Sequence, residues 1–241
     1  MVVTGGSRGI GASIAILAAR AGYKVAVNYV RNAKAAQDVV DEIVKDGGEA
    51  LAVQADVGAQ AEVQRLFTEV DGKLGKVDAL VNNAGVLGKC RVEDMDTAAV
   101  EDMFRANVFS MYYCSREAVR RMSPKHGGHG GVIVNMSSVA SRLGGLGGGS
   151  HYAGTKGAID SFSLALSKEV GGEKIRVNTV RPGLIVTDIH DSHGGVNPDY
   201  AKLVPMGRWG EADEVARVVL WLASDEASYV HGAVIDVSGG R

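Results

Sequence analysis

The sequence predicts an α/β fold in which a doubly wound parallel sheet of about seven strands carries helices on both faces. Short runs of β-branched and small apolar residues alternate with helical patterns from one end of the chain to the other. Several of these runs are almost wholly apolar, as strands covered on both faces must be. The 241 residues show no internal repeat, charge block or linker, so a single domain over residues 1–241 is expected.

Seven segments have the length and composition of buried strands, and helical stripes separate them. Apolar side chains recur at helical spacing from 10 to 21, from 36 to 44 and from 63 to 74, and glycines follow the first two stripes. Further helical runs cover 103–118 and continue after residue 152. The predicted strands are 2–4, 24–29, 50–54, 79–82, 132–137, 175–180 and 233–237.

Composition and charge exclude several classes of function. The formal net charge of −2 provides no basic field for nucleic acid or an anionic membrane, so neither partner is expected. The chain has no apolar run near the ~18 residues of a membrane span and begins without a leader-like segment. Cys90 and Cys114 are too few for a disulfide framework and are expected as free thiols, which favours a cytoplasmic location.

A glycine-rich turn follows the first predicted strand and opens into the first helix. Its glycines, spaced Gly5-x-x-x-Gly9-x-Gly11, let the backbone approach a pyrophosphate closely. The helix that follows offers unpaired N–H groups and the positive end of its dipole to the same anion. The placement predicts a Rossmann-type dinucleotide site, although a plain β-to-α turn has the same local pattern.

Six further motifs follow the glycine turn along the chain. They are Asp56-Val57, Asn82-Asn83-Ala84-Gly85, Asn107, Ser138, Tyr152-x-x-x-Lys156 and Arg181-Pro182-Gly183. Together with the turn, and in the same order, they resemble the short-chain dehydrogenase/reductase family over the whole chain, most nearly bacterial ketoacyl reductases and sugar dehydrogenase-like oxidoreductases. The resemblance implies transfer of a hydride between a nicotinamide and a small-molecule carbonyl or secondary alcohol substrate.

The end of the second predicted strand favours NADP over NAD. NAD-binding folds place a carboxylate there to hold the ribose 2′-hydroxyl, and residues 27–31, which include Asn28 and Tyr29, contain none. Arg8 and Arg31 can supply positive charge to a 2′-phosphate, while Ser7 and Asn28 can donate hydrogen bonds. If both arginines are merely solvated, NAD binds comparably.

The resemblance implies further cofactor contacts along the chain. Asp56 and Val57 are expected beside the adenine, residues 83–85 along the adenosine ribose, and Ile185 and Thr187 at the nicotinamide carboxamide. The full set of expected cofactor contacts is Gly5, Ser7, Arg8, Gly9, Ile10, Gly11, Asn28, Tyr29, Arg31, Asp56, Val57, Asn83, Ala84, Gly85, Tyr152, Lys156, Pro182, Gly183, Ile185 and Thr187.

Tyr152 and Lys156 are the candidate catalytic pair. Four residues apart on a helix, their side chains share one face. An ammonium one turn away is expected to stabilise the phenolate and lower the pKa of the phenol, so that Tyr152 can trade protons near neutral pH. Taken alone, the same spacing is common on ordinary helix surfaces.

Two more polar residues complete the candidate catalytic set. Ser137 and Ser138 end the fifth predicted strand, where side chains face the ligand crevice of an α/β sheet. The resemblance selects Ser138 to bind the substrate oxygen. Asn107 lies within a predicted helix, where asparagine is unfavourable, and matches the family asparagine that holds a water linking the lysine to solvent. The competing interpretations are a strand-end cap and an exposed polar position.

Residues 188–206 form a polar, irregular insert where the family carries a substrate lid. His190 and His193 are spaced like metal ligands, but no firm further ligand accompanies them, so no metal is expected. The resemblance also implies a homotetramer formed through helices 108–122 and 152–168 and the terminal strand 234–237. Two alternatives stay open: an NAD-linked sugar or polyol dehydrogenase, and a regulatory protein that binds the nucleotide without turnover.

Overall fold

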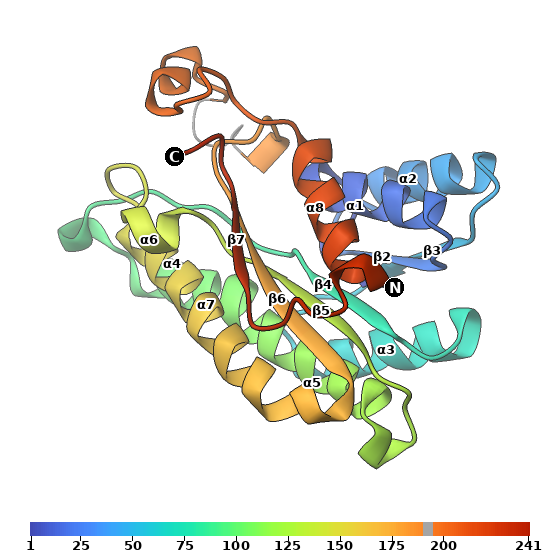
Figure 1. Ribbon diagram of the computed structural model, residues 1–241. Helices are drawn as coiled ribbons and strands as arrows, with labels where there is room; N and C mark the ends of the chain where they lie inside the picture. Colours follow the sequence, from blue (N-terminus) through green and yellow to red (C-terminus); the bar gives the residue numbers. More distant parts are fainter. Residues whose placement is uncertain (190–194) are drawn as a thin grey trace.

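The computed structural model describes residues 1–189 and 195–241, and its centre is a seven-stranded parallel sheet (Figure 1). The spatial order β3-β2-β1-β4-β5-β6-β7 confirms the predicted doubly wound fold. Every strand pair is parallel. The strands are β1 (Val2–Val3), β2 (Val25–Tyr29), β3 (Ala50–Gln54), β4 (Ala79–Asn82), β5 (Gly131–Met136), β6 (Ile175–Pro182) and β7 (Val234–Val237).

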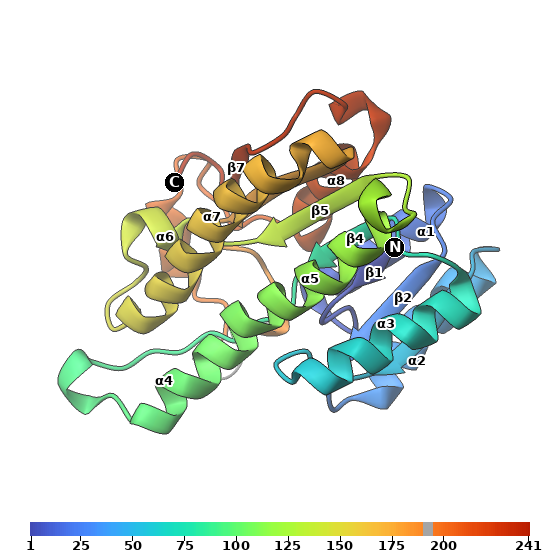
Figure 2. The same cartoon turned by 90° about the horizontal axis from the view of Figure 1, so that it is seen from below.

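Helices cover both faces of the sheet and bury two hydrophobic clusters against it. One cluster packs under α1 (Gly9–Arg20), α2 (Ala33–Lys45) and α8 (Ala212–Ala223). The other packs under α3 (Gln60–Leu74), α5 (Ser110–Met122) and α7 (Ser150–Val170), which Figure 2 shows from below. Neighbouring strand residues such as Val2 and Val3 belong to opposite clusters, because successive side chains in a strand point to opposite faces.

Local sequence explains why the helices begin and end where they do. The buried side of α2 follows the predicted apolar stripe, and the Asn32 side chain caps this helix by accepting a hydrogen bond from Ala35 N at 3.0 Å. Gly22 follows α1 with φ +91°, a conformation that favours glycine. β6 extends to Pro182, two residues beyond the prediction, because its last residues pair with Asp236 and Val237 of β7.

The helix predicted over 103–118 is interrupted in the structure. It consists of α4 (Thr97–Phe104) and α5, joined by a π-helical turn at Arg105–Phe109. A short helix, α6 (Ala140–Leu143), lies between β5 and α7. Among the residues that the structure describes, no helix is both long enough and apolar enough to cross a membrane.

Candidate active site

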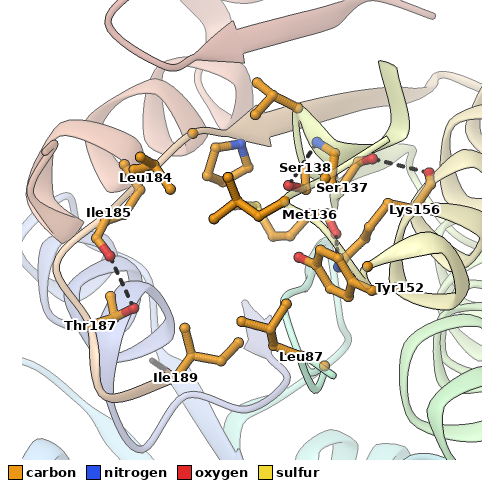
Figure 3. Close-up of a pocket in the computed structure, with 18 of the residues that line it drawn as sticks. Leu87, Met136, Ser137, Ser138, Tyr152, Lys156, Leu184, Ile185, Thr187 and Ile189 are labelled. Atoms are coloured by element: carbon orange, nitrogen blue, oxygen red, sulfur yellow. Dashed lines mark hydrogen bonds between the residues drawn. The ribbon is translucent and has the colours of Figure 1, made fainter. Parts of the chain in front are cut away.

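A cavity of about 200 Å³ opens at the carboxyl ends of the central strands (Figure 3). This edge is where parallel α/β sheets bind their ligands. The cavity joins residues that are far apart in the sequence, from the first loop of the chain to the segment after β6. The predicted site residues that line it are Ile10, Asn83, Gly85, Ser138, Tyr152, Lys156, Pro182, Gly183, Ile185 and Thr187.

The glycine turn has a backbone conformation suited to binding an anion. Gly5 and Gly9 have φ values of +62° and +54°, which side-chain-bearing residues rarely adopt. A Cβ at Gly11 would lie 2.3 Å from Gly5 O, so only glycine fits there. The N-cap residue of α1, Arg8, makes no side-chain capping bond, which leaves the first-turn N–H groups for a ligand. These residues fit the pyrophosphate of a dinucleotide.

Asn83 holds this turn against β4. Its Nδ2 donates to Thr4 O at 3.0 Å and Gly5 O at 3.1 Å. Thr4 Oγ1 accepts hydrogen bonds from the backbone N–H groups of Asn83 and Ala84, both at 3.0 Å. The motif after β4 therefore supports the turn after β1.

The structure corrects the expected role of Asn28. Its side chain is fully buried, with Nδ2 donating to Ala55 O at 3.0 Å and to Val53 O at 3.3 Å. Its Oδ1 accepts a hydrogen bond from Gly5 N at 3.3 Å. The Asn28 amide is thus committed to bracing β2, the end of β3 and the glycine turn, and it is not a free donor for a 2′-phosphate.

Positive charge is nonetheless available at this end of the site. Arg8 and Arg31 are exposed, and neither forms an ion pair within the described part of the chain. Ser7 and Tyr29 beside them are partly buried. The nearby acidic residue Asp56 is paired with Arg105 at 2.6 Å and accepts a hydrogen bond from Gly58 N, while Val57 is buried.

Lys156 is a buried cation at the base of the cavity. Its Nζ lies 5.6 Å from the centre of the Tyr152 ring and donates to Met136 O at 3.0 Å (Figure 3). Ser137 Oγ donates to the Lys156 carbonyl oxygen at 3.1 Å and so ties α7 to the end of β5. Burial lowers the Lys156 pKa to about 8, although the charge of Asp160, one helical turn on, opposes this shift.

Tyr152 differs from the expectation in one respect. Burial raises the pKa of its phenol, and the hydrogen bond with Ser138 lowers it in part. Lys156, whose ammonium donates to Met136 O, is not among the groups that shift the Tyr152 pKa in this structure. At neutral pH Tyr152 is therefore a protonated phenol that can donate its proton.

The two serines at the end of β5 have different partners. Ser137 is buried and donates to the Lys156 carbonyl oxygen, whereas Ser138 is partly exposed and lowers the pKa of Tyr152 in part. Ser138 Oγ also accepts a hydrogen bond from Ala140 N at 3.1 Å. This arrangement favours Ser138 as the serine that can reach a ligand.

Asn107 lies in the π-helical turn and is 1% exposed, which rules out an exposed polar position. Its Nδ2 donates to Val86 O and to Thr155 Oγ1, both at 3.0 Å, and its Oδ1 accepts from Val86 N at 2.7 Å. Asn107 thus links the loop after β4 to the residue preceding Lys156. It does not line the cavity itself.

The remaining cavity wall could not be identified from sequence motifs. Leu87, Leu146, Leu184 and Trp209 belong to loops without a recognisable pattern, and Leu143 ends the short helix α6. The only available signal was that these residues lie in the connections that follow β4, β5 and β6, at the edge where ligands bind.

The predicted lid is only partly described by the structure. Ile189, Gly195 and Tyr200 line the cavity, while His190 and His193 lie outside the described residues. Within the described ranges no group of three or more His, Cys, Asp or Glu side chains could hold a metal ion.

Comparison with known proteins shows similarity over the whole chain. The family model described as Enoyl-(Acyl carrier protein) reductase matches residues 5–241. The uncharacterized oxidoreductase YgfF of Escherichia coli is 49% identical, covering 100% of this chain and 98% of that protein. The 3-oxoacyl-(acyl-carrier-protein) reductase FabG of Staphylococcus aureus is 35% identical, covering 99% of this chain and 96% of that protein.

Solved structures show the same similarity in three dimensions. A short-chain dehydrogenase from Burkholderia cenocepacia in complex with NADP superposes with a TM-score of 0.90 at 31% identity, covering 99% of this chain and 96% of that one. A mutant short-chain dehydrogenase/reductase from Serratia marcescens superposes with a TM-score of 0.91 at 34% identity and the same coverage.

Proposed function

The chain belongs to the short-chain dehydrogenase/reductase family, and we propose that it is an NADP-dependent oxidoreductase acting on carbonyl compounds or secondary alcohols. The observation that carries the proposal is the placement of Ser138, Tyr152 and Lys156 along one cavity, next to a glycine turn built for a pyrophosphate. A protein that only binds nucleotide has no need of a protonated phenol, a serine hydroxyl and a buried ammonium gathered in one cavity.

The chain's own residues supply the proton chemistry. When bound, NADPH supplies a hydride to the carbonyl carbon and is oxidised. Ser138 hydrogen-bonds the carbonyl oxygen, and Tyr152 donates its proton to that oxygen as the C=O π bond breaks, so an alcohol forms. Lys156 would hold the nicotinamide ribose, and its charge would stabilise the phenolate that remains. In the reverse direction, Tyr152 accepts the proton of the alcohol.

Asn107 is proposed to support reprotonation of Tyr152. Its Nδ2 donates to Thr155, the neighbour of Lys156. Its Oδ1 lies close to Gly85 on the cavity wall, where the Cβ of any larger residue would be only 3.0 Å from this oxygen. A water held beside this amide would connect the buried ammonium to solvent.

The experiment that tests the function combines cofactor binding with turnover. NADPH and NADH are titrated separately by fluorescence, and NADPH oxidation is then followed with ketoacyl thioesters, quinones, diketones and aldoses. We expect tighter binding of NADPH and turnover of at least one carbonyl class. Binding without any turnover would favour the regulatory alternative, and tighter binding of NADH would favour the NAD-linked dehydrogenase.

Cofactor preference is expected to depend on Arg8 and Arg31. Each exposed guanidinium can form a charge-assisted bond with the 2′-phosphate, so Arg8→Ala and Arg31→Ala should each raise the Kd for NADPH about tenfold, ~1.4 kcal/mol. The Kd for NADH, which lacks this phosphate, should not change. Arg217→Ala, which removes an exposed arginine of α8, is the control. Equal losses for both nucleotides would contradict the assignment.

The reductive reaction should lose activity at alkaline pH. Because the Lys156 pKa is about 8, its charge is present below that value and is lost as the pH rises through it. The kcat/KM for carbonyl reduction should therefore be level near pH 6.5 and fall above about pH 8. Asp160→Asn should move this fall to lower pH, since Asp160 raises the Lys156 pKa, whereas exposed Asp199→Asn should not. A profile level to pH 9.5 would rule out a required Lys156 charge.

A homotetramer remains a proposal supported by exposed apolar side chains on the expected surfaces. Tyr112 on α5, Leu164 on α7 and Val234 on β7 are all exposed. We expect four chains to sediment together and Leu164→Glu to produce smaller species; a monomeric wild-type protein at micromolar concentration would contradict this. A cytoplasmic location is likewise proposed, in keeping with two cysteines that are both free.

A further inference from the structure

We propose that the cavity selects a carbonyl compound with an apolar body, and not a sugar or polyol. The inference rests on the proposed function and names the class of substrate for the same site. It follows from the apolar side chains that surround Ser138 and Tyr152, from the lack of Asp, Glu, Gln and His among the described lining residues, and from the exposed apolar side chains of the cavity wall.

Aliphatic side chains form most of the wall beyond the catalytic residues. Leu87 comes from the loop after β4, Leu143 and Leu146 from the segment between β5 and α7, and Leu184 and Ile189 from the segment after β6. In Figure 3, Leu87, Leu184 and Ile189 surround the same open space as Tyr152. Three separate segments thus turn hydrocarbon toward the place where the substrate oxygen is bound.

An aromatic pair extends this apolar wall. The rings of Tyr200 and Trp209 are nearly parallel, with an interplanar angle of 18° and centroids 6.5 Å apart, and both residues line the cavity. The Trp209 indole N–H donates to Asn197 O at 3.1 Å. That bond uses the only hydrogen-bond donor of the Trp209 side chain.

Strong hydrogen-bond acceptors are scarce in the described part of the wall. Among the described residues that line the cavity there is no Asp, Glu, Gln or His, so the side-chain acceptors are the amide oxygen of Asn83 and the hydroxyls of Ser, Thr and Tyr residues. Lys89 and Arg241 also line the cavity, but their side chains donate hydrogen bonds and accept none. Sugar hydroxyls entering this space would exchange water for hydrocarbon and leave donors unpaired, which disfavours their binding.

Part of the apolar wall is exposed to solvent. Among the lining residues, Val86 is 44% exposed and Leu143 is 42% exposed, and Ile189 is also exposed. Large apolar side chains gathered around an opening are typical of a surface that a ligand covers. An apolar substrate would remove this surface from water, whereas a polyol would not.

The test measures both turnover and binding. The probes are 4-tert-butylcyclohexanone and 2-decalone as apolar ketones, and D-xylose and dihydroxyacetone as hydroxylated carbonyl compounds. With NADPH, kcat/KM for the apolar ketones should exceed that for the hydroxylated compounds by at least about 100-fold. Trp221→Phe leaves Trp209 as the single tryptophan, so its fluorescence reports occupation of the cavity without turnover. The ketones should change this emission and D-xylose should not.

A matched pair of variants tests whether the apolar cavity wall is what favours apolar substrates. Leu146→Asn places an amide in the cavity and should lower kcat/KM for 2-decalone about tenfold with an unchanged Kd for NADPH. Leu203→Asn makes the same change at an exposed leucine that does not line the cavity, and it should have no effect.

The outcomes separate the inference from the proposed function. Preferred turnover of D-xylose or dihydroxyacetone with NADPH would overturn the apolar substrate class while the oxidoreductase function stands. A change of Trp209 emission with the ketones but no turnover would support the apolar site and count against the proposed reaction. No change of emission with either ketone would overturn the inference.

Discussion

Tyr152→Phe is expected to lower kcat for carbonyl reduction about 10³-fold while the Kd for NADPH stays within about twofold. The variant removes only the hydroxyl that donates the proton, and a positioned general acid contributes roughly 10²–10⁴-fold. The ring and its packing against Lys156 remain, so the cavity keeps its shape. Steady-state kinetics and a fluorescence titration of the cofactor measure the two effects separately.

Tyr229→Phe provides the control for this substitution. Tyr229 is fully exposed, so loss of its hydroxyl should change neither turnover nor cofactor binding. If Tyr152→Phe retained more than a tenth of the wild-type kcat, another group would have to deliver the proton, and the assignment of Tyr152 would be wrong. Because the raised pKa keeps Tyr152 protonated at neutral pH, this loss should be the same at pH 6.5 and pH 7.5.

Lys156→Met should lower kcat about 10²–10³-fold and leave the thermal stability equal or higher. The activity falls because the site loses a preorganised charge that stabilises the developing phenolate. Stability is maintained because burial of the ammonium destabilises the folded state, as its lowered pKa indicates. Methionine fills a similar volume and carries no charge that has to be desolvated. Thermal unfolding and kinetics measured on the same preparation test both parts.

Lys168→Met is the matched control, since Lys168 is an exposed lysine near the end of the same helix. It should alter neither kcat nor the pH profile. If Lys156→Met unfolded at a temperature well below that of the wild type, the bond to Met136 O would stabilise the fold by more than desolvation of the ammonium destabilises it. The prediction that Lys156 serves activity at a cost in stability would then be wrong. The alkaline fall in kcat/KM expected for the wild type should also be missing from the residual activity of this variant.

Hydrophobic patterning was enough to predict the sheet and its covering helices. Strand residues such as Val27 and Val81 lie in nearly pure apolar runs, which only a sheet buried on both faces accommodates. The interrupted helix around Asn107 could not be predicted in this way. The apolar spacing shows no break at the π-helical turn, and the partners of the Asn107 amide in that turn, Val86 and Thr155, are distant in the sequence.

The candidate catalytic residues were visible in the sequence because their spacing is local. Tyr152 and Lys156 share a helix face at four residues' separation, and the glycines of the first turn lie within seven residues of one another. Asn28 shows the limit of such reasoning. Its residue type fits a donor to a phosphate, but its burial between β3 and the glycine turn commits it to the protein's own backbone.

The sequence by itself determined the fold class, the family and the residues able to carry the chemistry, because periodicity and short motifs are properties of neighbours along the chain. Only the tertiary structure decided the electrostatics and the shape of the site. The pKa values of Lys156 and Tyr152 are set by burial, and the cavity wall is assembled from loops after three different strands. Burial and wall composition arise from contacts between segments distant in sequence, and these contacts exist only once the chain has folded.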